Sequence, residues 1–243
     1  MKKNVKETIA EFKTEAQELE HRYYSFDFCY FYFRSSKEEI KGNINIEQSC
    51  QVLWSYLASW GMLRGSSFLL SKNPAYLKDL VKWIYEQPKS TWEIDVEDYE
   101  NKSKEVLNLY NQINKFLLRG TTTLVTKILL GVFAITPAYD RFFKDTFKEI
   151  SGNKCSFIKF DESSLIAISK FYKENKREID QLSKEHKVIN FNDKVRLMKS
   201  DSVRKSNIEL LRIISMFMIL THHYVVNSGI MEGFGEGSTS INY

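Results

Sequence analysis

The stretch T-T-T-L-V-T-K-I-L-L-G-V-F-A, residues 121–134, is apolar on nearly every side when it is drawn as a helix. A helix at the surface of a protein has one apolar stripe, whereas a helix that is apolar all round is buried. We therefore expect residues 121–134 to form the central helix of the fold. Lys127 is the charged residue of this stretch, so its ammonium group needs a partner inside the protein.

The segments on either side also carry apolar residues at helical spacing, and the longest of them is 46–70. Further segments with this period are 3–20, 75–86, 98–118, 137–150 and 161–182. The aromatic run at 23–33 fits a period of two or a buried helix, and we favour a helix because no second strand pattern lies nearby. The sequence predicts an all-α fold, an irregular helical bundle of roughly six to eight helices. Residues 46–70 and 121–134 are expected to touch at its centre.

The composition narrows the classes of function. Hydrophobic residues make up 43% of the 243-residue chain, enough for a core of ordinary size. The net charge is +4, and Lys and Arg alternate with acids rather than clustering, which argues against a nucleic-acid partner. The three cysteines are far apart and form no CxxC pair, and no apolar segment follows the basic N-terminus. These features indicate a reduced, cytoplasmic setting, and no motif predicts a cofactor or a metal.

The chain divides into three parts by composition. Residues 1–185 form the predicted helical domain, 186–202 a polar linker, and 203–243 carry one apolar helix. The apolar core of that helix, residues 213–220, is shorter than the ~20 residues that a membrane span needs. A membrane span and a buried or interfacial helix therefore both fit. We predict a cytoplasmic domain with membrane contact through residues 208–226.

Three charged residues within apolar surroundings are the candidate site. Arg64 lies in the 46–70 stretch, Lys127 in the most apolar helix, and Asp140 in the expected first turn of the next helix. One interpretation is that the three pair across the bundle and fix the register of the helices, because buried charges need partners.

A small-anion site is the second interpretation of the same residues. Arg64 and Lys127 would bind the anion, and the hydroxyl groups of Ser66 and Ser67 would donate hydrogen bonds to it. Two glycines within a helix cost about 1 kcal/mol each relative to alanine. Their presence at 61 and 65 therefore indicates close approach of another helix or of a ligand.

Two motifs within the predicted domain resemble a family of bacterial helical proteins without an established activity. They are W-G-M-x-R-G-S-S-F-L-L from residue 60 and T-K-I-L-L-G…P-A-Y-D-R-F-F from residue 126. The resemblance spans residues 20–180. It implies that these residues form one folding unit, and it implies no mechanism.

The tail, K-S-N-I-E-L-L-R-I-I-S-M-F-M-I-L-T-H-H-Y from residue 205, resembles a second family. It is similar to the start of the integral-membrane acyltransferases that O-acetylate cell-surface polysaccharides. The resemblance implies that Arg212 opens the first membrane helix and that His223 is a catalytic residue near the site of acyl transfer. It covers residues 203–243 only, and one helix cannot supply both an acyl-donor pocket and an oxyanion site.

The sequence therefore predicts a helical binding or interaction domain with a small anionic ligand, not catalytic as given. The alternative prediction is that the chain is an N-terminal fragment of a membrane-bound O-acyltransferase that transfers acyl groups to cell-surface polysaccharide.

Overall fold

The computed structural model describes residues 5–15, 21–39, 45–152, 155 and 157–185. These residues form an all-α irregular bundle, and no strand occurs among them, which confirms the predicted class. The longer helices are α1 (Val5–Glu15), α2 (Ser25–Glu39), α3 (Ile46–Ser59), α4 (Lys78–Glu86), α5 (Tyr99–Phe116), α6 (Thr122–Ile128), α7 (Arg141–Ile150), α8 (Glu162–Glu174) and α9 (Lys176–Glu185). Short 3-10 turns are η1 (Arg22–Tyr24), η2 (Phe68–Ser71), η3 (Pro74–Leu77), η4 (Thr91–Glu93) and η5 (Val96–Asp98), and η6 (Leu129–Phe133) is a π-helix.

The described part thus contains nine α-helices, one more than the upper end of the expected range. The expected helix over 161–182 is two helices, because α8 ends at Glu174 and is capped by Asn175 before α9 begins. The aromatic run at 23–33 forms η1 and α2, which confirms the preference for a helix.

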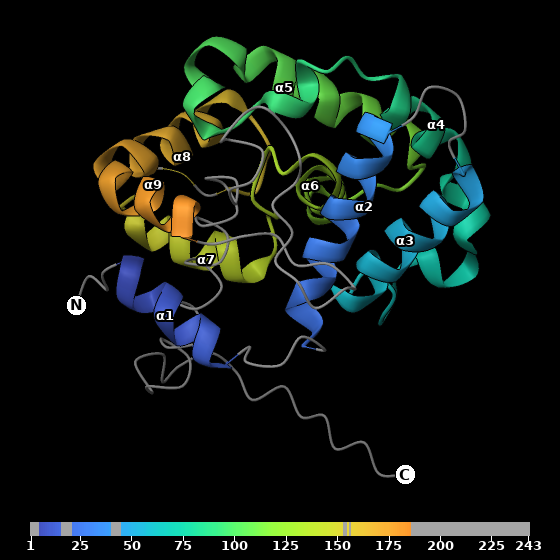
Figure 1. Ribbon diagram of the computed structural model, residues 1–243, viewed down its shortest axis with the longest axis horizontal. Coiled ribbons are helices and arrows are strands. Elements are labelled where there is room, and N and C mark those ends of the chain that lie inside the picture. Colours follow the sequence, from blue (N-terminus) through green and yellow to red (C-terminus); the bar gives the residue numbers. More distant parts are fainter. Residues whose placement is uncertain (1–4, 16–20, 40–44, 153–154, 156, 186–243) are drawn as a thin grey trace.

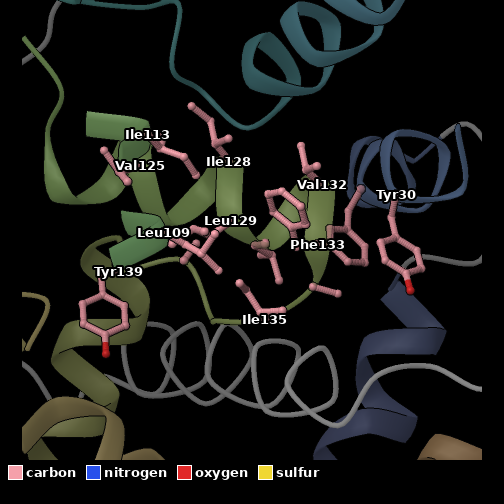
Figure 2. Packing of buried hydrophobic residues seen from close by; sticks show 14 of the residues in the cluster. Tyr30, Leu109, Ile113, Val125, Ile128, Leu129, Val132, Phe133, Ile135 and Tyr139 are labelled. Carbon is pink, nitrogen blue, oxygen red and sulfur yellow. The ribbon is translucent and has the colours of Figure 1, made fainter. Parts of the chain in front are cut away.

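The central position of α6 and η6 is confirmed. In Figure 1 α6 lies near the middle of the molecule, surrounded by the other helices. Every residue from Leu124 to Ile135 is buried. Figure 2 shows Val125, Ile128 and Leu129 among the apolar side chains of this core. The helix is buried on all sides because apolar residues cover its whole circumference.

The expectation of one helix over 46–70 is wrong, because α3 ends at Ser59. Gly61 follows with a φ of 73°, in the left-handed region that glycine adopts without steric cost. The amide of Gly61 donates to the carbonyl of Ala58, and the amide of Met62 donates to the carbonyl of Leu57. This hydrogen-bond pattern is a Schellman motif, a common end of a helix. The glycine therefore terminates the helix and carries no cost within it.

A second boundary also differs from the prediction. The helix expected from Pro137 begins only at Arg141, and the segment between Ala134 and Asp140 is not helical. Ala134 has a φ of 54°, which stops η6. Asp140 caps the start of α7, since its carboxylate accepts a hydrogen bond from the amide of Phe143 at 3.1 Å.

The expected contact between the segments 46–70 and 121–134 is present. The hydroxyl group of Tyr56 in α3 donates to the carbonyl of Lys127 in α6 at 3.0 Å. A Cβ atom at Gly131 would lie 2.3 Å from the Tyr56 ring, so only glycine allows this approach. The small residue brings α3 and η6 close together and packs the ring against the backbone.

The predicted linker 186–202 and the segment 203–243, with the membrane contact expected at 208–226, lie outside the described residues. Among the helices of the described part, none combines the length and the apolar character that crossing a membrane requires.

Candidate functional site

Two threonines of α6 position the segment that carries Asp140. The amide of Tyr139 donates to the hydroxyl of Thr126 at 2.8 Å, and the hydroxyl of Thr123 donates to the carbonyl of Tyr139 at 2.8 Å. Both backbone groups of Tyr139 are therefore held on α6. Because Lys127 follows Thr126 and Asp140 follows Tyr139, these contacts bring the two charged residues to the same place.

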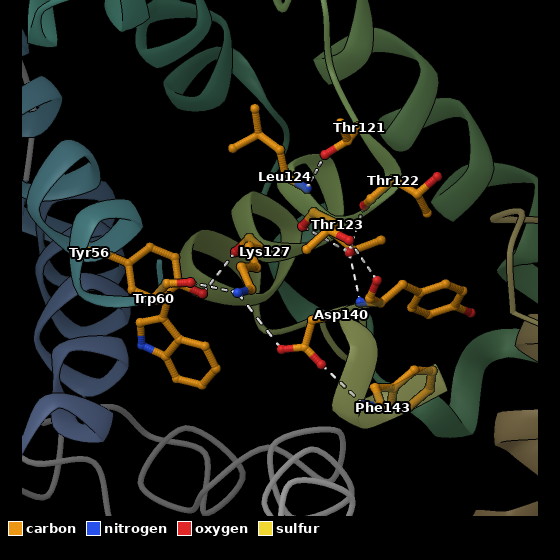
Figure 3. Close-up of polar contacts among 11 residues, drawn as sticks. Tyr56, Trp60, Thr121, Thr122, Thr123, Leu124, Lys127, Asp140 and Phe143 are labelled. Atoms are coloured by element: carbon orange, nitrogen blue, oxygen red, sulfur yellow. Dashed lines mark hydrogen bonds and ion pairs between the residues drawn. The ribbon is translucent and has the colours of Figure 1, made fainter. Parts of the chain in front are cut away.

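Lys127 has three interactions around its ammonium group. Its Nζ donates to the carbonyl of Trp60 at 2.6 Å, lies 3.7 Å from Oδ2 of Asp140, and lies 5.7 Å from the centre of the Trp60 ring. Figure 3 shows Lys127 between Trp60 and Asp140. The Trp60 carbonyl lies at the C-terminal end of α3, where the helix dipole favours a positive charge.

Burial lowers the pKa of Lys127, and the side chain is only 6% exposed. The charge of Asp140 opposes this shift, whereas the positive charges of Arg64 and Arg22 add to it. Desolvation is the largest of these effects, so the protein loses some stability by keeping this amine charged. The pair with Asp140 and the bond to Trp60 offset part of that cost.

Arg64 takes a different position from the one that pairing with Asp140 requires. Its side chain is exposed, and its guanidinium lies over Gly61, where a Cβ atom would be 3.0 Å from Nε. Within the described residues, no acid lies at ion-pair distance from Arg64. The predicted pairing of the three residues is therefore only partly correct. Lys127 pairs with Asp140, whereas Arg64 affects Lys127 only through the repulsion between their positive charges.

The two serines differ in their surroundings. Ser66 is exposed in the turn between Gly65 and η2. Ser67 is half-buried, and its hydroxyl accepts a hydrogen bond from the amide of Leu69 at 3.3 Å as the N-cap of η2. No contact within the described part joins either hydroxyl to Lys127. Donation from Ser66 and Ser67 to an anion stays a prediction.

Tyr56 and Trp60 were not among the predicted site residues. Lys127 bonds the backbone carbonyl of Trp60, and a backbone acceptor leaves no trace in the residue type. The contact of Tyr56 had one indicator in the sequence, Gly131 within an otherwise bulky helix, since such a glycine marks close approach. The predicted catalytic residue His223 lies outside the described residues.

Comparisons of this chain with protein-family models, with curated proteins and with solved structures find no match. The resemblances of residues 20–180 and 203–243 stay predictions. The residues around Lys127 supply one buried ion pair and one exposed guanidinium beside it.

Proposed function

We propose that the helical domain is a non-catalytic binding domain and that it binds a small anion at Arg64, beside the pair of Lys127 and Asp140. The observation that carries this proposal is the exposed guanidinium of Arg64, which lies on the turn at Gly61 with no acidic partner among the described residues. A planar guanidinium in this state offers paired N–H donors to a phosphate or carboxylate.

The local charge supports the same proposal. Asp140 pairs with Lys127 and offsets its positive charge. The positive charge of Arg64 is not offset in this way. The positive charge of Arg64 contributes to lowering the pKa of Lys127, as expected for two cations that repel each other. An anion bound at Arg64 would reduce this repulsion, and binding is expected to raise the pKa of Lys127.

Thermal unfolding with and without phosphate tests the proposal. A ligand at one hundred times its Kd stabilises the folded state by about 2.7 kcal/mol. For a domain of this size that corresponds to a rise in Tm of roughly 5–10 °C. The reference sample contains sodium chloride at the same ionic strength, which separates a bound anion from charge screening.

Arg64→Gln is the informative variant, and Arg177→Gln is its matched control. Arg177 is exposed on α9, so its substitution changes the net charge equally. We expect phosphate to raise the Tm of the wild type and of Arg177→Gln but not that of Arg64→Gln. An equal rise in all three proteins would contradict the proposal.

Acyl transfer to a cell-surface polysaccharide is a second candidate, and the spacing of Arg212 and His223 favours it. Its test is the O-acetyl content of surface polysaccharide in cells that produce the full chain. The His223→Ala variant is expected to abolish any acetylation that the wild type adds. Acetylation that is the same with and without the wild-type chain would remove this candidate.

A further inference from the structure

Two long segments of the chain contain no acidic residue. They are 48–78 and 106–139, and each carries three positive residues. The first contains Arg64, Lys72 and Lys78, and the second contains Lys115, Arg119 and Lys127. The whole chain has a net charge of only +4, so the acids are concentrated in the other segments. Lys127 is buried and pairs with Asp140, whereas the other five positive residues are exposed and add positive charge to the surface.

The fold brings the two segments together at Tyr76, on η3. The hydroxyl of Tyr76 lies 3.2 Å from the amide of Leu118, which donates to it, and 3.5 Å from the carbonyl of Phe116, to which it donates. Phe68 packs on the Tyr76 ring at 5.9 Å, and Nζ of Lys72 lies 5.5 Å from the centre of that ring. The turn that follows α5 is thus attached to η3 and η2.

The two segments joined at Tyr76 each carry an exposed leucine. Leu118 is 83% exposed, the largest value among the large hydrophobic residues of the described part, and Leu70 on η2 is 55% exposed. Leu118 is held in this position by its backbone contact with Tyr76. A single exposed leucine is common on protein surfaces, so the charges beside Leu118 decide which partner this surface fits.

Positive residues lie close to Leu118 in the chain. Arg119 follows Leu118 directly and Lys115 precedes it by three residues, and both are exposed. Neither forms an ion pair with an acid of the described residues. We define the basic apolar face as the exposed residues Leu70, Lys72, Lys115, Leu118 and Arg119.

We propose that the basic apolar face docks on the surface of a membrane that contains anionic lipids. Leucine side chains gain free energy at the boundary between headgroups and acyl chains, and lysine and arginine gain it near lipid phosphates. Charge complementarity selects this partner, because the two segments that form the face contain no acid that would repel anionic lipid. A nucleic acid would satisfy the cations but would leave Leu118, the most exposed apolar residue of the face, without an apolar partner.

Co-sedimentation of the full chain with vesicles tests the proposal. One vesicle is phosphatidylcholine alone, and the other contains phosphatidylglycerol as well. We expect the wild type to bind the anionic vesicle, and added salt to weaken that binding. Leu118→Gln is expected to weaken binding about tenfold, and Arg119→Gln about fivefold.

Matched controls lie on other helices, α8 and α9. Ile166 is 52% exposed on α8, and Arg177 is exposed on α9, so Ile166→Gln and Arg177→Gln make the same chemical changes elsewhere. Both controls are expected to bind like the wild type. Binding of Leu118→Gln equal to that of the wild type would overturn the proposal and assign vesicle binding to another part of the chain, such as 208–226.

Two further outcomes also oppose the proposal. Equal binding of the wild type to both vesicles would show that anionic lipid is not selected. Binding to a single-stranded RNA that depends on Arg119 and not on Leu118, without binding to vesicles, would assign the face to nucleic acid. The proposal is independent of the small-anion site, because Arg64→Gln is expected to lose the response to phosphate and to keep vesicle binding.

Discussion

Gly131→Ala is predicted to destabilise the protein, although alanine is normally the better residue in a helix. In a helix interior, replacing glycine by alanine stabilises by about 1 kcal/mol. At this position the new Cβ would lie 2.3, 2.6 and 2.8 Å from three atoms of the Tyr56 ring. Ordinary contact begins at 3.4 Å, so the ring has to move away.

The ring of Tyr56 has little freedom to move. It is 1% exposed, it packs against the rings of Phe26 and Trp60, and its hydroxyl donates to the carbonyl of Lys127. Overpacking of a core costs about 1–3 kcal/mol, and loss of the hydrogen bond costs about 1 kcal/mol more. After the gain in helix propensity, we expect a net loss of about 1–3 kcal/mol of unfolding free energy.

Urea unfolding of the wild type and of Gly131→Ala measures this change. A control is the same substitution in a Tyr56→Leu background, where removal of the ring makes room for the methyl group. There the substitution is expected to cost less than in the wild type by at least about 1 kcal/mol. A Gly131→Ala protein as stable as the wild type, or more stable, would refute the close packing of α3 on η6.

Three further predictions concern the ion pair, the α8–α9 contact and the tail. Burial lowers the pKa of Lys127 in the folded protein below the 10.5 that a lysine has in the unfolded chain. Between the folded and the unfolded pKa the unfolded state therefore binds more protons, and the stability of the protein rises with pH. Lys127→Met should remove this rise, and urea titrations at several alkaline pH values that show the same slope in both proteins would contradict the assignment. The hydroxyl of Tyr172 accepts from Lys176 at 2.6 Å and lies within hydrogen-bond distance of the Glu97 and Asp180 carboxylates. Tyr172→Phe should therefore lower the unfolding free energy by about 1–2 kcal/mol, and an unchanged urea midpoint would argue against this network. A chain that ends near residue 195 should fold with an unchanged Tm, because the predicted linker is polar, and a loss of several degrees would place the tail in the core.

The all-α class and the central helix could be predicted because the order of the residues shows two things. It shows the helical spacing of the apolar residues, and it shows whether they would cover all sides of a helix. The ends of the helices could not all be predicted. Gly61 looks the same within a helix and just after one, and its role depends on the Schellman hydrogen bonds around it. Thr136 and Pro137 have the residue types of a helix start, yet the contacts of Tyr139 with α6 keep that segment non-helical.

The site could be predicted in part for a similar reason. A lysine in the most apolar helix requires an opposite charge, which pointed to Asp140, and the two are paired. Within a buried helix Arg64 would also have needed an opposite charge. It lies instead in the turn after α3, where its side chain is exposed. The acceptor at Trp60 is a backbone carbonyl, which sequence composition does not reveal.

The central claim is that an anion binds at the guanidinium of Arg64, and a ¹H–¹⁵N NMR titration with phosphate tests it most directly. The side-chain Nε–H of Arg64 and the amides of Gly61 and Gly65, which flank it in the same turn, report on this place. We predict that these signals shift together and saturate, while the Nε–H of Arg177 on α9 does not shift beyond a sodium chloride reference of equal ionic strength. Signals of Arg64, Gly61 and Gly65 that do not move, or that move no more than the signal of Arg177, would contradict the claim.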